Sequence, residues 1–260
     1  MVSVDRIGQG CSGGQASGTV RAAGGKLHAM TDPPSERVFA RQFHAAEGAE
    51  AWRVLPEGAC AFFRSDSFSA SVRFVAAISA LVREGDEPNV DIRREGVSLL
   101  LRSFKKNGYG LTQADLDFAR AVSEIARDLG LSADPQVVQS LSIIPGATDR
   151  SAIMPFWQVV LGYQPRPDSP DEDLVDPHDR LAPFWFEQMD ELRADGAGTV
   201  HLVVWLPWDE AESRVAAGLA AGGRLVRHDE EELFWTLADP VGNEVDIATT
   251  PAPQQVATDE

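Results

Sequence analysis

Hydrophobic and polar residues alternate along several short stretches in the second half of the chain. The clearest is Thr199–Leu206, in which His201 falls on the same side as Val203 and Trp205. Such alternation predicts a strand with one buried face. Three further strands are predicted at Arg224–His228, Leu233–Leu237 and Glu244–Ala248.

A helix is predicted between the first and second of these strands. Asp209 is its expected N-cap, Glu212 stands in the capping-box position, and Gly222 and Gly223 end it. The Pro and Gly-Asn residues of Asp239–Asn243 are typical of a turn between the last two strands. The predicted order is therefore βαβββ.

The same order is predicted once more upstream. Its strands are expected at Val137–Ile144, Asp173–Asp176 and Pro183–Met189. Its helix is capped by Thr148 or Asp149 and stops at Gly162, and Pro155 should kink the helix or mark its true start. Two such units in tandem predict an internal repeat.

The first half of the chain follows a different pattern. Helices are predicted at Ser35–Glu47, Phe68–Arg83 and from Gly110 to Gly130, and strands at Cys60–Arg64, Asn89–Arg93 and Val97–Ser103. In the third helix Thr112 is the expected N-cap, with Asp115 in the capping-box position. Residues 1–34 are rich in Gly, Ser and Ala and are expected to be disordered, with Met30 an alternative initiator to Met1.

Charge is distributed unevenly along the 260 residues. The first 133 residues hold 16 Lys and Arg against 16 Asp and Glu, and the remainder hold 7 against 24, which accounts for the net charge of −17. Such a field repels phosphate backbones and argues against a nucleic-acid partner. Two distant cysteines, no apolar run of membrane-spanning length and no secretory signal together favour a cytoplasmic protein.

Three stretches of the second half carry a family resemblance. Phe156–Gly162, the strand with His201, and the Asp-Pro-Val-Gly-Asn-Glu-Val-Asp run of 239–246 resemble the vicinal oxygen chelate superfamily, above all its glyoxalase-like, bleomycin-resistance-type domains. The resemblance covers about Gln136–Thr250. It implies that two βαβββ units form one cupped sheet around a small-molecule site.

The resemblance also implies a metal-ligand set. Carried over by position, the four ligands fall on Gln139, Glu187, His201 and Asp246. After a one-residue slip, Ser140 or Ser142 would replace Gln139 on that face. This set suits Zn²⁺, Ni²⁺, Mn²⁺ or Fe²⁺, and Glu187 or Asp246 would move a proton in catalysis.

Other readings of these residues stay open. His201 on a half-buried strand can be an ordinary core or pocket histidine, and many superfamily members bind drugs or metabolites without metal. Three tryptophans on predicted strands, Trp185, Trp205 and Trp235, could line such a pocket or belong to the core.

The first half resembles the pterin-4a-carbinolamine dehydratase family. The resemblance spans about Val38–Leu131 and is carried by Gly-Leu-Thr-x-x-Asp-x-x-x-Ala at 110–119. The family's His-His-Pro is Asp86-Glu87-Pro88 here, and its Thr-His is Ser103-Phe104. An exposed carboxylate is ionised near pH 7 and cannot replace the proton donation of an imidazole, so we expect a retained fold without dehydratase chemistry.

Together these patterns predict an α+β protein with two domains. Residues 35–133 form a pterin-dehydratase-like antiparallel sheet with helices on one face, residues 134–250 form the paired glyoxalase-like domain, and residues 251–260 are a tail. The expected function is a glyoxalase-like lyase or isomerase acting on a small molecule, either with or without a divalent metal. The alternatives are an active 4a-hydroxytetrahydrobiopterin dehydratase and a non-catalytic drug- or metabolite-binding protein. Both resemblances imply a homodimer by analogy, and no membrane partner is expected.

Overall fold

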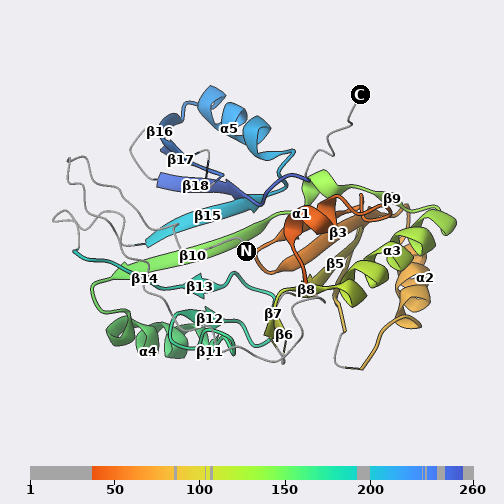
Figure 1. Cartoon of the computed structure of the whole chain (residues 1–260), viewed down its shortest axis with the longest axis horizontal. Coiled ribbons are helices and arrows are strands. Elements are labelled where there is room, and N and C mark those ends of the chain that lie inside the picture. The colour runs from red at the N-terminus through yellow and green to blue at the C-terminus, as the bar shows by residue number, and fades with distance from the viewer. Residues whose placement is uncertain are drawn as a thin grey trace.

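The computed structural model describes residues 37–84, 87–102, 104–105, 108–191, 200–229, 231, 233–238 and 244–253. The segment 1–34 and most of the tail predicted from residue 251 lie outside these ranges. Within them the strands form a five-stranded sheet, a nine-stranded sheet and two short strand pairs (Figure 1). None of the helices described has the length and apolar character needed to cross a membrane.

The first domain is built on the five-stranded sheet. Its path is β2-β3-β5-β4, antiparallel throughout, with β9 beside β3. These strands are β2 Trp52–Leu55, β3 Gly58–Arg64, β4 Asn89–Arg93, β5 Gly96–Arg102 and β9 Ser132–Ala133. The helices are α1 Ala40–His44, α2 Phe68–Ser79 and α3 Gln113–Asp128, and the short strand pairs are β1 Arg37–Val38 with β8 Leu111–Thr112 and β6 Phe104–Lys105 with β7 Gly108–Tyr109.

Alternation along the strands sends every second side chain toward the helices. On β2, Trp52 and Val54 lie in the core that α2 and α3 cover. Phe63 is 1% exposed and packs edge-on against Phe74 of α2 at a centroid distance of 5.2 Å. The Trp52 indole donates to the Ala119 carbonyl of α3 at 3.1 Å, which satisfies its buried N–H.

The predicted start of α3 is confirmed, and that of α1 is wrong. The capping box of α3 is confirmed, since the Thr112 N–H donates to the Asp115 carboxylate at 2.7 Å and the Asp115 N–H to the Thr112 hydroxyl at 3.4 Å. The helix predicted at Ser35–Glu47 is wrong in length. Residues 37–38 pair with β8 instead, so α1 begins only after the extended Phe39.

The second domain has two units of the predicted βαβββ order, with the strand predicted at Pro183–Met189 divided into β13 and β14. Its first unit is β10 Ser140–Ala147, α4 Arg150–Leu161, β11 Gln164–Pro165, β12 Asp173–Val175, β13 Phe184–Trp185 and β14 Glu187–Gln188, preceded by a 3-10 turn at Pro135–Val137. Its second unit is β15 Val200–Leu206, α5 Ala211–Ala220, β16 Arg224–Asp229, β17 Phe234–Ala238 and β18 Glu244–Thr249. The units join through antiparallel pairing of β10 with β15, which lie side by side at the centre of the sheet (Figure 1).

Both helices of this domain cover the same face of its sheet. Under α4, Met154 packs with Leu174, Phe184 and Phe186, and under α5, Val215 packs with a cluster that includes Leu237 and Ile247. Pro155 lies inside α4, whose first residue is Arg150 after the cap Asp149. The predicted N-cap Asp209 is wrong, because Glu210 caps α5 without a side-chain bond.

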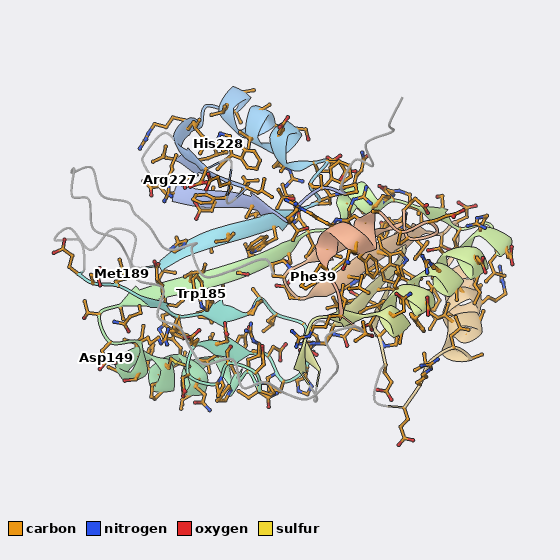
Figure 2. The ribbon with its side chains drawn as sticks, viewed as in Figure 1. Phe39, Asp149, Trp185, Met189, Arg227 and His228 are labelled. Atoms are coloured by element: carbon orange, nitrogen blue, oxygen red, sulfur yellow. The ribbon has the colours of Figure 1, made fainter. Side chains whose placement is uncertain are left out.

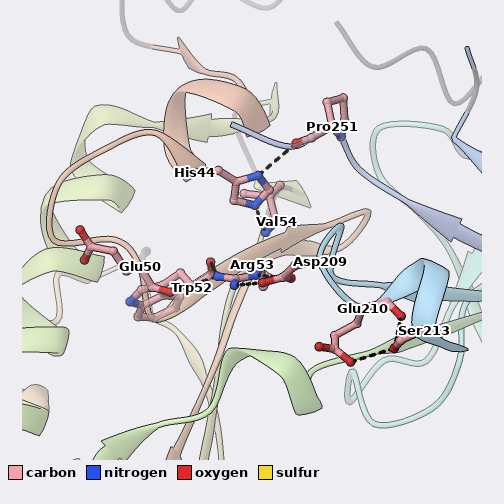
Figure 3. A network of polar contacts seen from close by, with 9 residues as sticks. All are labelled: His44, Glu50, Trp52, Arg53, Val54, Asp209, Glu210, Ser213 and Pro251. Carbon is pink, nitrogen blue, oxygen red and sulfur yellow. Dashed lines mark hydrogen bonds and ion pairs between the residues drawn. The ribbon is translucent and has the colours of Figure 1, made fainter. Parts of the chain in front are cut away.

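The two domains are joined by polar contacts around β2 (Figure 3). The Arg53 guanidinium donates to the Asp209 carboxylate at 3.1 and 2.5 Å. His44 bridges the backbone of both domains, accepting from the Val54 N–H at 2.9 Å and facing the Pro251 carbonyl at 3.2 Å. The Thr250 hydroxyl donates to the Val54 carbonyl at 2.6 Å.

An apolar contact lies beside these bonds. Leu55, whose side chain points away from the helices of its own domain, packs with Trp205 and Ala248 of the second sheet. The first domain therefore covers one end of the face of the second sheet that α4 and α5 leave uncovered.

Candidate functional site

Strand register gathers three of the predicted site residues on the face of the large sheet that α4 and α5 do not cover. His201 of β15 is paired with Ile144 of β10, and Val203, two residues on, is paired with Asp246 of β18. Since paired residues in neighbouring strands share a face, His201 and Asp246 project to the same side.

Glu187 reaches that face from β14, which pairs with β10 on the side away from β15. It is paired with Gly146, which follows Ile144 by two residues on β10. A Cβ on Gly146 would meet the Met189 sulfur at 2.4 Å, so Met189, two residues after Glu187, lies over that glycine on the same face. Glycine at 146 therefore leaves room for the Met189 side chain on this face, close to Glu187.

The Asp246 carboxylate is held by a neighbouring strand. The Thr236 hydroxyl of β17 donates to Asp246 Oδ1 at 2.6 Å, and both side chains are buried. This bond fixes the orientation of the Asp246 carboxylate.

The pKa of Glu187 is raised to about 7, by burial first and by the charge of Asp246 second. The two residues belong to strands separated by β10 and β15, so their mutual effect requires a strongly curved sheet. A carboxyl group with a pKa near 7 can both accept and return a proton at neutral pH.

Burial favours the neutral form of the other two groups as well, although it moves their pKa values in opposite directions. The pKa of His201 is lowered by burial, against the opposing charges of Asp246 and Glu244. The pKa of Asp246 is raised by burial, against the Thr236 hydrogen bond and the charge of His201. Burial thus favours the neutral form of all three groups. Glu187, His201 and Asp246 together are called the acidic cluster.

Arg227 is a cation on the same face that the sequence pattern did not reveal. It is paired with Thr236, which is paired with Asp246, so all three share a side. A β-bulge between Leu225 and Arg227 adds one residue to β16, and Arg224 and Arg227 therefore face the same way although three positions separate them. Simple alternation would have placed them on opposite faces.

Comparison with known families fits this geometry. Residues 142–248 match the family model described as a glyoxalase-like domain. The C-terminal domain is glyoxalase-like. No curated protein matches the chain.

Two solved structures were found to be similar to part of the chain. One is titled as an NAD-dependent benzaldehyde dehydrogenase from Legionella pneumophila, at 11% identity and a TM-score of 0.33, covering 43% of this chain and 99% of that one. The other is titled as a glyoxalase/bleomycin resistance protein/dioxygenase superfamily member from Vibrio splendidus 12B01, at 16% identity and a TM-score of 0.27, covering 44% and 100%. At these TM-scores neither likeness carries an argument about function.

Gln139, the fourth predicted ligand of the glyoxalase-like domain, lies apart from the other three. It precedes β10 and accepts a bond from Arg214 of α5 at 3.4 Å. Ser140 and Ser142 occupy the face of His201 instead, since they are paired with Trp205 and Val203. The one-residue slip considered from the sequence is the arrangement that the strands adopt.

The residues as placed do not fit a bound divalent metal. In the described ranges, no three side chains of His, Cys, Asp or Glu lie together in a way that could hold a metal ion. Without Gln139, the acidic cluster supplies an imidazole and two carboxylates that do not converge on one point.

The three tryptophans of the glyoxalase-like domain divide between its two faces. Trp205 and the half-buried Trp185 pack in the apolar cluster beside the acidic cluster, on the same face. Trp235 instead packs with the α5 cluster, and its ring stacks on His228 at 4.9 Å between centroids. Trp235 therefore does not line the face that bears Glu187, because it is paired with Ile247 rather than Asp246.

The predicted remnant of a pterin site lies in the first domain. Glu87 is exposed and Pro88 leads into β4. Asp86 and the side chain of Phe104 fall outside the described residues. The matched family model does not extend to this domain, so its likeness to pterin dehydratases stays a prediction.

Proposed function

We propose that the glyoxalase-like domain is a small-molecule enzyme of the isomerase or lyase type, in which the acidic cluster transfers a proton. The observation that supports this proposal is the gathering of Glu187, His201 and Asp246 on one partly buried sheet face from three separate strands. An ordinary sheet face has no reason to bury three ionisable groups together, because burial disfavours their charged forms.

The proposed reaction begins with removal of a proton from a carbon next to a carbonyl group. Glu187 accepts the proton, the C–H electron pair forms a carbon–carbon double bond, and the carbonyl oxygen gains negative charge. Neutral His201 donates an N–H to that oxygen. When the first carbon bears a hydroxyl group, the enolate oxygen takes up a proton, that hydroxyl loses its proton and becomes the new carbonyl, and return of the first proton to the former carbonyl carbon completes an isomerisation. Loss of a leaving group from the next carbon, driven by the enolate electron pair, instead gives elimination.

Proton exchange with solvent tests this step without knowledge of the natural substrate. The full-length protein is incubated in D₂O with hydroxyacetone, dihydroxyacetone and phenylacetone, and loss of each α-proton signal is followed by NMR. We expect exchange above the buffer rate, with an inflection near pH 7, and its loss in Glu187→Gln. Exchange at the buffer rate for every compound, or an unaffected Glu187→Gln variant, would contradict the proposal.

Metal analysis of the purified protein tests whether the acidic cluster holds a metal ion. Protein purified without chelator should contain less than one equivalent of Zn, Ni, Mn or Fe. A stoichiometric metal that disappears in His201→Ala would show that the cluster closes around an ion. The dehydratase alternative for the first domain is tested separately, by the rate of 4a-hydroxypterin dehydration above the spontaneous rate.

A non-catalytic binding function is the second candidate. Trp185 favours it, since this half-buried ring lies beside the cluster, whereas Trp205 is buried. Under this alternative, ligands bind and Trp fluorescence changes, but no α-proton exchanges.

A further inference from the structure

We infer that the helix-bearing side of the glyoxalase-like domain is a docking surface for a second copy of this chain. The inference does not depend on the proposed function, because it concerns the side of the sheet opposite to the acidic cluster. It starts from the two central strands, β10 and β15, which lie between α4 and α5 (Figure 1).

Part of these two strands is left bare between the helices. Ile143 of β10 packs in the α4 cluster and is paired with Leu202 of β15. Val204 of β15 packs in the α5 cluster and is paired with Leu141 of β10. Leu141, Val200 and Leu202 share this face and are between 39% and 49% exposed. These three residues are called the central strip, and neither helix shields them from solvent.

The outer side of α4 adds to this apolar surface. Phe156, Val159 and Val160 are between 62% and 81% exposed, although the inner side of the same helix is also apolar. A surface helix ordinarily carries polar residues on its outer side, and a helix that is apolar on both sides is typically buried. Figure 2 marks the N-cap of this helix, Asp149, at the outer edge of the second domain. The composition of α4 therefore indicates a packing partner on its outer side.

This apolar surface is uncharged in an otherwise acidic half of the chain. Residues 134–260 hold 24 Asp and Glu against 7 Lys and Arg, yet β10 has no charged residue, and His201 of β15 lies on the other face. Arg150 is the one charged residue of α4, and it donates to Glu172 at 2.6 Å. Two copies of net charge −17 repel each other over most of their surfaces, so an uncharged patch is where they can meet.

Symmetry and area also favour a second copy as the partner. A twofold dimer buries the same patch on both subunits, and an uncharged apolar patch meets itself without placing like charges together. The six exposed side chains of the central strip and α4 each offer on the order of 100 Å², which together falls somewhat short of the roughly 800 Å² that one partner buries in a stable complex. We therefore expect a weak dimer, with a dissociation constant on the order of tens of micromolar.

Sedimentation equilibrium of the full-length protein tests this inference. We expect the weight-average mass to rise from that of the monomer at about 2 µM toward that of the dimer at about 200 µM. Raising NaCl from about 0.05 M to about 0.5 M should tighten the dimer, because salt screens the repulsion between two acidic copies. Association held by ion pairs would instead weaken.

Matched pairs of variants locate the surface. Val159→Glu on α4 and Leu202→Glu on β15 should each weaken the dimer at least about tenfold, because each buries a carboxylate against a copy of itself. Val72→Glu on α2 and Leu225→Glu on β16 add the same charge at exposed positions of another helix and another strand, and should change the constant by less than about twofold. Circular dichroism checks that each variant is folded, and Val159→Glu places a good helix former at a highly exposed position.

Three outcomes would overturn the inference. A chain that stays monomeric at the highest concentration would leave this surface to another partner or to a segment of its own chain. Equal weakening by the variants and their controls, or a dimer that weakens with added salt, would place the contact elsewhere on the molecule. None of these results bears on the acidic cluster, because that cluster lies on the opposite face of the sheet.

Discussion

The five-stranded and nine-stranded sheets both carry helices on one face, and they use the other face differently. In the first domain a single contiguous core lies under α2 and α3, and the opposite face meets the second domain through Leu55. In the second domain the apolar residues divide into smaller clusters, two of them under α4 and α5, and ionisable groups occupy the opposite face beside the third cluster. The first sheet thus has its helix-covered face in one contiguous core, whereas the second sheet buries ionisable groups on the face that its helices leave uncovered.

The largest expected effect lies in the first core. Phe63→Ala removes a ring packed between Trp52 and Phe74 and should lower the free energy of unfolding by about 3–5 kcal/mol. Phe156→Ala on α4, where the side chain is 62% exposed, is the matched control and should change it by less than about 0.5 kcal/mol. Urea unfolding measures both. Equal losses of unfolding free energy in the two variants would contradict the tight packing of Phe63 in the first core.

The junction between the domains should respond to acid. Burial lowers the pKa of His44 to about 4, and the neutral ring accepts a hydrogen bond from the Val54 N–H. The unfolded chain takes up this proton near pH 6.5, so stability is full above that pH and falls as pH drops toward 4.

We expect this histidine to account for about 2 kcal/mol of the loss, after allowance for its partial exposure. Urea unfolding between pH 7 and 4 measures it, and an NMR titration reports the pKa directly. His44→Gln should flatten the dependence. An unchanged slope in that variant would mean that the junction does not titrate.

The uncovered face should show the opposite pH dependence. The pKa of Glu187 is about 7 in the folded protein and ordinary in the unfolded chain, so the folded state binds the extra proton and loses stability as pH rises from about 4.5 to 7. Glu187→Gln should remove about 1–2 kcal/mol of that loss. Stability measured at pH 5 and pH 8 gives the difference. If the variant loses stability at pH 8, Glu187 has a structural rather than a chemical role.

The smallest expected effect compares a helix cap in each domain. Thr112→Ala at α3 and Asp149→Ala at α4 each remove a side-chain acceptor for a backbone N–H and should cost about 1 kcal/mol. Thermal unfolding followed by far-UV circular dichroism checks this. If the joined domains unfold as one unit, both variants lower the same transition. Two separate transitions would show that the contacts around β2 do not couple them.

Much of the fold follows from local pattern. The tandem βαβββ order, the Thr112–Asp115 capping box and the shared face of His201 and Trp205 were all predictable, since each depends on spacing within one element. The errors arose where distant contacts decide. Residues 37–38 pair with a strand more than 70 positions away, and Asp209 binds Arg53 of the other domain instead of capping α5.

The candidate site was predictable in part for the same reason. Glu187, His201 and Asp246 obey regular alternation, and the structure brings them together. Gln139 lies one position away from the residues of β10 that face His201, and a bulge changes the face on which Arg227 lies. Neither the register nor a bulge can be predicted from the sequence of one strand alone. Trp235 alternates regularly but on the side that α5 covers.

The bridge made by His44 has a consequence for the order of assembly. Its acceptor at Pro251 is 207 positions later in the chain, so on the ribosome this histidine is synthesised long before that carbonyl exists. The first domain can form its core early, but its edge beside β2 stays open to water until the last strand of the second domain has been translated and has folded. Residues 249–251, at and after the end of β18, thus cover this edge of the first domain, and a nascent chain halted before them would expose it.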